Sequence, residues 1–340
     1  MAMKRYLIVK LAAIGDVIMA MPMVDLIKKE EPDSEITWIC GKSTQSLLKH
    51  LPIDHLFAID EIKLLTGSRM EKIQVVLDVW KKIAGKTFDV IAMGHADKRY
   101  QILTIFTKSH DKRSFSHKIG FTWPVPGRHH TDEYARLVAS HMPIEPIQSY
   151  HMAAIPDDET IKKIIGSKSH PIITLAPGGA KNLLADDACR RWPISHYVQL
   201  AILLVKAGYT VILSGTLGDK WILPYFDSIP VIDLVGKTSL QQLLYLFDQS
   251  DVVVTHDSGP MHLAGMTKCK IIALFGPTNP WEKVPRREGV QFFWEPEKYS
   301  CSPCYDGKTY AHCNKNSCLE GIEAERILKE IQKMVQEEES

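Results

Sequence analysis

A dense group of polar residues, Thr255–His262, follows three consecutive valines. A helix that begins here would direct the backbone N–H groups of Ser258 and Gly259 at an anion, where the helix dipole favours negative charge. His262 lies one turn further on, and its ring could donate to a phosphate. Asp257 and Ser258 could instead cap the helix beside a packed histidine. The density of polar groups after a buried strand favours a diphosphate site.

Two arginines and a glycine-rich turn could belong to the same site. Gly178 and Gly179 follow another apolar run, Ile172–Ala176, and glycines let the backbone approach a ligand closely. Arg190 and Arg191 offer fork-shaped donors for phosphate. Each signal is weak alone, because adjacent arginines are usually solvated. Together, after a strand of the same domain, they predict an anion clamp.

Two further turns complete this group of candidate ligand-binding residues. Asp219 ends the turn Ser214–Asp219, and its carboxylate could accept hydroxyl groups of a ribose. Thr278 ends the turn Phe275–Thr278. Both could instead be ordinary turns, in which the side chains only hydrogen-bond to the nearby backbone.

A carboxylate follows the first apolar run of the chain. The turn Lys10–Asp16 precedes an apolar helix, and Gly15 permits a tight entry into that helix. Asp16 therefore lies at or near the helix start. It could cap free backbone N–H groups, or it could act as a general base. Position alone favours the cap, because caps are common and bases are rare.

The stretch Lys98–Arg128 is locally basic, with seven cations against one acid, Asp111. It could be a solvated face, or it could dock an anionic acceptor or a membrane surface. On the second interpretation, Lys112, Arg113 and Lys118 are candidate acceptor-binding residues.

Four cysteines lie close together near the end of the chain. Cys301 and Cys304 form a C-x-x-C pair, and Cys313 and Cys318 follow within a short polar loop. Four such thiols can form a tetrahedral zinc site. The second pair is spaced more loosely than a paired knuckle, and reduced thiols can simply pack. We therefore expect no metal, and a structural role for these cysteines in either case.

The elements that position these residues alternate along the chain. Short apolar runs separated by helical patterns predict doubly wound α/β sheets with mostly parallel strands. A chain of 340 residues is too long for one core and suits two domains. Prolines interrupt the segment Met142–Thr160, so we expect domains at 1–150 and 151–320, and a C-terminal helix at 321–340. The expected strands are Tyr6–Leu11, Ile36–Cys40, Leu56–Ile59, Asp89–Met93, Ile172–Ala176, Thr210–Ser214, Val231–Leu234, Val252–Thr255 and Ile271–Phe275.

Composition limits the classes of function. Apolar residues make up 45%, charged residues make up 24% and the formal net charge is +1, so the chain is globular and no overall field attracts nucleic acid. No apolar segment reaches the length of a membrane helix, and Lys10 and Asp16 interrupt the run Tyr6–Met23, which argues against a secretory signal. We expect a cytoplasmic protein with no nucleic-acid partner.

The chain resembles a known family at these same positions. The D-S-G-P-M-H of Asp257–His262 is followed by the L-F-G-P-T of Leu274–Thr278, and this pairing is specific. Ile8–Val17 is similar to the family's opening motif, and Arg190–Pro193 is similar to its K-R-W-P motif. The chain thus resembles the bacterial ADP-heptose:lipopolysaccharide heptosyltransferases, glycosyltransferase family 9, over nearly its whole length.

The resemblance implies the GT-B fold, in which two Rossmann-like domains face a central cleft. The N-terminal domain would bind the acceptor, and the C-terminal domain would bind the nucleotide sugar. Transfer in this family inverts the anomeric centre and needs no metal, so the resemblance implies no cofactor.

Individual roles follow from the motifs of the family. Asp16 occupies the position of the catalytic base, and Arg190 occupies that of a diphosphate-binding lysine. The loop between Ala180 and Arg190 is longer than in the family, which leaves the exact donor and acceptor open. The start of the donor-binding helix matches Asp257, Ser258, Gly259 and His262.

The chain is therefore expected to move a heptose or related sugar from an ADP-sugar to the lipopolysaccharide inner core. Peripheral contact with the inner face of the inner membrane would accompany a glycolipid acceptor. Two alternatives share the fold, a nucleotide-sugar 2-epimerase and a non-catalytic sugar-nucleotide binding module. Asp16 argues against the binding module, and product analysis separates the three.

Overall fold

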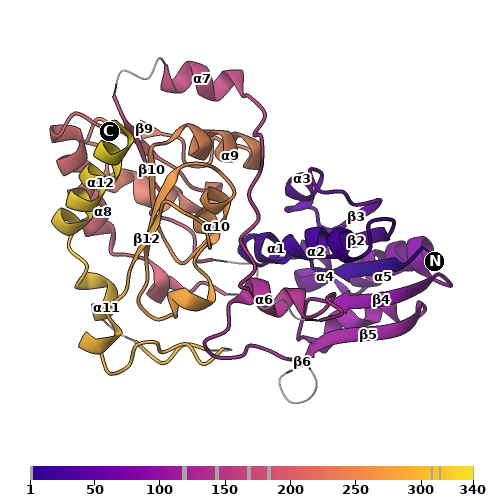
Figure 1. The fold of residues 1–340 in the computed structure, drawn as a ribbon. Helices are drawn as coiled ribbons and strands as arrows, with labels where there is room; N and C mark the ends of the chain where they lie inside the picture. The colour runs from indigo at the N-terminus through magenta and orange to yellow at the C-terminus, as the bar shows by residue number, and fades with distance from the viewer. Residues whose placement is uncertain are drawn as a thin grey trace. The chain divides into compact units, whose positions relative to one another are not determined.

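The computed structural model describes residues 3–116, 121–141, 145–166, 170–181, 185–307, 309–313 and 315–339 of the chain. The chain divides into two compact units, Met1–Tyr150 and His151–Ser340. Each unit is a layered α/β structure built on one parallel sheet, as Figure 1 shows. The division falls inside the segment 142–160, in which the prolines interrupt regular structure.

The first unit has a six-stranded sheet in the order β3-β2-β1-β4-β5-β6, with parallel neighbours throughout. Its inner strands are buried, because helices cover a parallel sheet on both faces. The strands are β1 (Arg5–Val9), β2 (Glu35–Gly41), β3 (His55–Ile59), β4 (Thr87–Met93), β5 (Lys108–Ser116) and β6 (Phe121–Thr122). The helices are α1 (Ile14–Ala20), α2 (Pro22–Glu30), α3 (Gln45–Leu48), α4 (Glu61–Thr66), α5 (Arg69–Ile83), the 3-10 helix η1 (Lys98–Thr104) and α6 (His130–Ala135).

The second unit repeats this plan with the order β12-β11-β10-β7-β8-β9, again with parallel neighbours. Its strands are β7 (Ile172–Leu175), β8 (Thr210–Leu213), β9 (Ile232–Asp233), β10 (Val252–His256), β11 (Lys270–Leu274) and β12 (Val290–Phe293). Its α-helices are α7 (Glu159–Ile165), α8 (Ile194–Lys206), α9 (Leu240–Gln249), α10 (Gly259–Gly265), α11 (Ser317–Glu320) and α12 (Ala324–Glu339). Its 3-10 helices are η2 (Ala188–Arg190), η3 (Leu217–Tyr225), η4 (Pro280–Glu282) and η5 (Pro296–Lys298).

The C-terminal helix α12 belongs to the core of the second unit. It packs against α8, and Ile327 and Ile331 are fully buried in the same cluster as Leu200 and Leu204 of α8. These two isoleucines are one turn apart and so lie on one face of α12, which is the amphipathic pattern that the sequence predicts. Burial of this face attaches the end of the chain to the second sheet.

When the strands of each unit are numbered by their order in the sequence, the two sheets have the same spatial order of strands. In each unit the first strand, β1 or β7, lies beside the fourth, β4 or β10, and the order of the strands reverses between them. Loops that leave such a pair of strands diverge, which opens a crevice beyond their carboxyl ends where ligands of α/β sheets bind. The residues that follow these four strands are therefore the candidates for chemistry.

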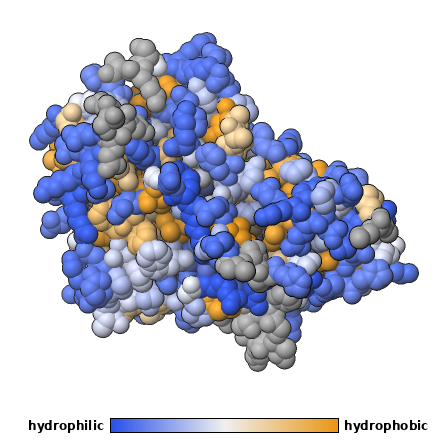
Figure 2. Space-filling view, viewed as in Figure 1, coloured by the Kyte–Doolittle hydropathy of each residue, from blue (hydrophilic) through white to orange (hydrophobic). Residues whose placement is uncertain are grey.

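The sequence analysis missed the strands β5, β6 and β12. β5 falls inside the basic stretch Lys98–Arg128 and pairs with β4 along its length. Its polar sequence has low β propensity, because charged side chains pack poorly on a buried sheet. Most of its side chains are at least partly exposed, which explains how a polar segment can form a strand here. Hydrophilic side chains also cover most of the face seen in Figure 2.

Candidate functional site

A glycine turn after β7 forms one wall of the candidate site in the second unit. A Cβ on Gly178 would lie 2.3 Å from Cγ of Asp219, so only glycine fits there. Gly179 has φ +82, in the left-handed region that favours glycine. Its N–H donates to Oδ1 of Asp219 at 2.9 Å. The turn is therefore held close against the loop that follows β8.

Asp219 serves the backbone of two loops. Besides Gly179, its carboxylate accepts from the backbone N–H of Thr216 at 2.7 Å and from the hydroxyl of Thr216 at 2.6 Å. The side chain is buried, with a relative exposure of 5%. These contacts favour a role in positioning the loops, whereas the contact to a ribose stays a prediction.

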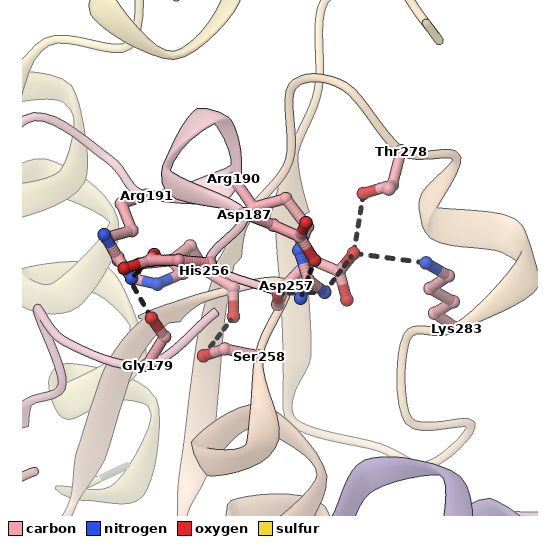
Figure 3. Close-up of polar contacts among 10 residues, drawn as sticks. Gly179, Asp187, Arg190, Arg191, His256, Asp257, Ser258, Thr278 and Lys283 are labelled. Atoms are coloured by element: carbon pink, nitrogen blue, oxygen red, sulfur yellow. Dashed lines mark hydrogen bonds and ion pairs between the residues drawn. The ribbon is translucent and has the colours of Figure 1, made fainter. Parts of the chain in front are cut away.

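Asp257 lies at the centre of a charged cluster directly after β10 (Figure 3). Thr278 donates its hydroxyl to Oδ2 of Asp257 at 2.8 Å, Nζ of Lys283 lies 3.4 Å from the same oxygen and Nη1 of Arg190 lies 3.5 Å away. Burial would raise the pKa of Asp257, but Lys283 and Arg190 outweigh it and hold the pKa well below its ordinary value. Asp257 is therefore ionised, and two cations converge on it.

Both terminal nitrogens of Arg190 are hydrogen-bonded within the second unit. Its Nη1 donates to the backbone oxygen of Asp257 at 3.0 Å, and its Nη2 donates to Oδ2 of Asp187 at 3.1 Å. The remaining nitrogen, Nε, is buried and has no hydrogen-bond partner in the described part of the chain. A buried N–H without a partner is costly, so this atom is suited to a ligand that supplies an acceptor.

The neighbouring Arg191 has a different task. Its Nε donates to the backbone oxygen of Gly179 at 2.8 Å, and its guanidinium forms an ion pair with Asp186. Of the two predicted arginines, only Arg190 joins the cluster around Asp257. Arg191 instead holds the glycine turn in place.

Ser258 begins α10 without capping it. Its hydroxyl donates to the backbone oxygen of His256 at 3.2 Å and makes no cap hydrogen bond to the first turn of the helix. His256 is fully buried, which lowers its pKa to about 3, and the hydroxyl of Tyr197 lies 3.2 Å from its Nδ1. His262 is buried too and helps to lower the pKa of Asp257, so it lies close to the charged cluster.

Two residues of this cluster were missed by the sequence analysis, Lys283 and Tyr310. Lys283 follows the short helix η4 and carries no motif, although its ammonium group also lies 4.9 Å from the ring centre of Tyr305. Burial raises the pKa of Tyr310 well above its ordinary value even though Arg190 opposes the shift, so Tyr310 is neutral beside that arginine. The cysteine-rich loop that carries both tyrosines therefore contributes to this site.

Asp16 follows β1, which lies beside the reversal of the strand order in the first unit. Ala13 is the N-cap of α1 and Asp16 is the third residue of the helix, so Asp16 is not the cap. Its side chain is 35% exposed and lies 3.2 Å from Nζ of Lys10, whose side chain is only 4% exposed. Burial lowers the pKa of Lys10, and Asp16 opposes that shift. The carboxylate is thus partly open to solvent and held from one side by a buried cation.

Tyr134 and His95 complete the surroundings of Asp16, and the sequence analysis missed both. Burial raises the pKa of Tyr134 well above its ordinary value, and the hydrogen-bonded Asp16 carboxylate adds to the shift. His95 follows β4 and accepts at Nε2 from the backbone N–H of Leu11 at 3.0 Å. Burial and the charge of Lys10 lower the pKa of His95 well below its ordinary value, so its ring is neutral.

The structure separates the three predicted acceptor-binding residues. Lys112 is an exposed residue of β5. Arg113 is mostly buried, and it donates to Asp111 at 2.7 Å and to the backbone oxygen of Ala139 at 2.7 Å, so it holds the strand in place. Lys118 lies outside the described residues. The contacts of Arg113 favour a role in the fold, and acceptor contact by Lys112 and Arg113 stays a prediction.

The four cysteines lie in the loop that follows η5 and at the start of α11. Cys301 and Cys313 are exposed, whereas Cys304 and Cys318 are half-buried. Sγ of Cys313 accepts from the backbone N–H of Asn316 at 3.3 Å. The described residues contain no cluster of three or more histidine, cysteine or acidic side chains arranged to hold a metal. Metal analysis of the purified protein tests whether this loop binds zinc.

A sequence model described as glycosyltransferase family 9 (heptosyltransferase) matches residues 100–314 of the chain. The chain is 26% identical to lipopolysaccharide core heptosyltransferase OpsX of Haemophilus influenzae over 300 residues, which cover 84% of this chain and 82% of that protein. It is 33% identical to lipooligosaccharide heptosyltransferase 2 of the same organism over 162 residues, which cover 44% and 42%.

Solved structures show the same fold. A glycosyl transferase family 9 structure from Veillonella parvula has a TM-score of 0.77 at 20% identity, covering 98% of this chain and 97% of that one. ADP-heptose lps heptosyltransferase II of E. coli has a TM-score of 0.74 at 19% identity, covering 99% and 100%. Within the described residues, no helix has both the length and the apolar character that crossing a membrane requires.

Proposed function

The chain belongs to glycosyltransferase family 9, the heptosyltransferases, and we propose that it moves a heptose from ADP-heptose to the inner core of lipopolysaccharide. The family and the fold class predicted from the sequence are confirmed: the chain is a glycosyltransferase with the GT-B fold, built from two Rossmann-like domains. The proposed donor and acceptor take their support from two similar proteins, a lipopolysaccharide core heptosyltransferase and an ADP-heptose lps heptosyltransferase.

The observation that carries the donor site is the cation pair around Asp257. Arg190 and Lys283 converge after β10, where the strand order of the second sheet reverses. A diphosphate placed there would meet two positive charges and the unpartnered Nε of Arg190. As the bond to the sugar breaks, negative charge grows on the diphosphate, and fixed cations stabilise it without reorganisation. The N–H groups of Ser258 and Gly259 and the ring of His262 remain candidates for the same role.

Asp16 is the proposed general base. Its carboxylate takes the proton from the acceptor hydroxyl as this oxygen attacks the anomeric carbon, and the nucleotide diphosphate leaves from the opposite face. Lys10 and Tyr134 support this role, because both contact the carboxylate and favour its ionised form. Its 35% exposure leaves room for an acceptor.

The two units divide the substrates in this proposal. The second unit, residues 151–320 with the helix at 321–340, binds the donor, and the first unit, residues 1–150, binds the acceptor. Because lipopolysaccharide precursors are glycolipids, the enzyme works in the cytoplasm at the inner face of the inner membrane. Lys112 is the described residue that we propose for acceptor contact.

Nucleotide binding tests the donor half directly. ADP at a hundred times its dissociation constant stabilises the folded protein by about 2.7 kcal/mol. For a unit of this size that corresponds to a rise in unfolding temperature of roughly 5–10 °C. UDP and GDP at the same concentrations should produce a smaller rise. If none of the three nucleotides changes the unfolding temperature, the proposed donor site is wrong.

A further inference from the structure

A cavity of about 510 Å³ lies in the first unit, among α4, α5 and η1. Its volume is in the range of ligand pockets, which are mostly apolar with a few polar groups. Its walls are leucine, isoleucine, valine and aromatic side chains, among them Leu65, Trp80 and Tyr100. The charged residues of its lining are all basic: Lys72, Lys98 and Arg99. It contains none of the residues assigned above to donor binding or proton transfer.

An exposed apolar stripe on α5 continues from this cavity. Val75, Val79 and Ile83 bury one face of the helix in the core of the unit. Met70, Ile73 and Leu77 follow one another at helical spacing on another face, and Met70 and Ile73 are 75% and 52% exposed. A surface helix needs only one apolar face, so the second stripe has no function in the core.

Residues at and after η1 extend the same apolar surface. Phe106 is 56% exposed, and its ring meets that of Trp80 edge to face at 4.5 Å between ring centres. The indole N–H of Trp80 donates to the backbone oxygen of Ile102 at 2.9 Å, so its polar atom is satisfied and its ring can face an apolar phase. Soluble monomers seldom expose contiguous apolar side chains of this size without a partner.

The charges around the cavity select the partner. Arg99 is paired with Asp97, whereas neither Lys72 nor Lys98 forms an ion pair with any residue that the structure describes. Two available lysines beside an apolar surface complement a molecule that carries an acidic headgroup and a hydrocarbon chain. Lipid anchoring of a protein takes both signals, because either one alone binds weakly and reversibly.

We propose that this face, named here the α5 face and made of Met70, Lys72, Ile73, Leu77, Trp80, Lys98, Ile102 and Phe106, docks on an anionic lipid bilayer and takes one acyl chain into the cavity. The inference rests on the proposed function only in that a glycolipid acceptor places the enzyme at a membrane. The site itself is distinct from the surroundings of Asp16 and from the charged cluster of the second unit.

Sedimentation with vesicles tests the proposal without donor or acceptor. The protein should bind vesicles of phosphatidylglycerol and phosphatidylcholine and should not bind phosphatidylcholine alone. Lys72→Gln with Lys98→Gln should weaken binding roughly tenfold to thirtyfold, since each lysine near an anionic surface contributes about fivefold. The matched control, Lys49→Gln with Lys220→Gln, removes the same charge from exposed positions outside the cavity and should bind like the wild type.

Apolar substitutions test the hydrocarbon half. Ile73→Ser with Leu77→Ser should weaken vesicle binding at low and high salt alike, whereas the lysine variant should differ from the wild type mainly at low salt. Ile164→Ser with Ile202→Ser, two exposed isoleucines of the second unit, is the matched control. Both substituted pairs are exposed, so the fold should survive.

Three results would overturn the proposal. One is equal binding of the wild type to neutral and anionic vesicles. Another is wild-type vesicle binding by both α5-face variants. The third is a dimer in solution that the Ile73 and Leu77 variant abolishes, since the α5 face would then be an interface between copies of the chain. ADP binding by the variants should stay unchanged in every case, which separates failure here from failure of the proposed donor site.

Discussion

The two sheets place carboxylates in different charge environments where their strand order reverses. After β1, the first unit presents the partly exposed carboxylate of Asp16, with Lys10 as a buried partner. After β10, the second unit buries the carboxylate of Asp257 and surrounds it with Arg190 and Lys283. Both points lie where the strand order reverses, and the order itself is the same in both units. The loops, and not the topology, therefore decide which unit offers a base and which offers a positive field.

The two carboxylates also differ in how much of each side chain is exposed to solvent. The side chain of Asp16 is 35% exposed, whereas that of Asp257 is 4% exposed. A base must reach the proton that it removes, and a carboxylate that organises two cations need not contact the substrate at all. The comparison predicts that loss of Asp16 affects the chemical step, and that loss of Asp257 affects the integrity of the site.

The largest expected effect is on catalysis by Asp16→Asn. The amide keeps the size of the side chain but cannot take a proton, so transfer should fall by roughly a hundredfold or more. ADP affinity should be unchanged, because the donor residues lie in the other unit. Steady-state transfer and calorimetry with ADP measure the two quantities.

Asp33→Asn is the matched control, since Asp33 is an exposed aspartate of the same unit. It should retain wild-type transfer. If Asp16→Asn transfers sugar as fast as this control, Asp16 is not the base. The different exposure of Asp16 and Asp257 would then not reflect different roles in catalysis.

Arg190→Ala should produce the next largest effect, on donor affinity. A buried phosphate would lose a charge-assisted partner, at a cost of roughly 1.5–3 kcal/mol. Calorimetry should show ADP binding weakened by roughly tenfold to a hundredfold. Arg326→Ala removes an arginine of the same unit that pairs with Glu295, and it should bind ADP like the wild type. Equal ADP affinity of the two variants would exclude Arg190 from the donor site.

Asp257 should make stability depend on pH. Its folded-state pKa is held below the ordinary value by Lys283 and Arg190, so it contributes stability above the unfolded-state value of about 3.9, and this contribution is lost as the pH falls. Thermal unfolding of Asp257→Asn should begin several degrees below the wild type at pH 7. The gap should narrow as the pH falls from about 5 to about 3. A gap that stays constant over this range would contradict the ion cluster.

The smallest expected effect concerns Lys112→Gln. An exposed lysine contributes little to a fixed contact, so the Michaelis constant for acceptor should rise only a fewfold and the change should vanish at high salt. Lys108→Gln on the same strand is the control. Wild-type acceptor kinetics of Lys112→Gln at low salt would make this side of β5 a solvated face.

Most of the scaffold could be predicted, because burial on both faces leaves a clear signal. Runs such as Val252–Val254 are apolar without interruption, and they form strands where the sequence analysis expects them. β5 could not be predicted from the sequence. Its side chains are largely exposed and charged, so they show no alternation of apolar and polar residues and have low β propensity. The strands of both units could therefore be predicted from the sequence to the extent that their side chains are buried.

The sequence points to candidate site residues where a motif follows a strand. Asp16 and Asp257 were named in this way, and their roles stay predictions. Lys283 and Tyr134 were not, because they reach the sites from distant segments and only the folded chain brings them near. Asp219 also follows a strand and hydrogen-bonds to the backbone of two turns, and its contact with a ribose stays a prediction.

In the proposed reaction the chain transfers a sugar from a nucleotide donor to a lipopolysaccharide acceptor. Mass spectrometry of a heptose-free lipopolysaccharide precursor, incubated with the protein and ADP-heptose, tests it most directly. The precursor should gain the mass of one heptose and ADP should be released in equal amount, and Asp16→Asn should show neither change. An isomerised nucleotide sugar with an unchanged precursor, or no change in either substrate, would contradict it.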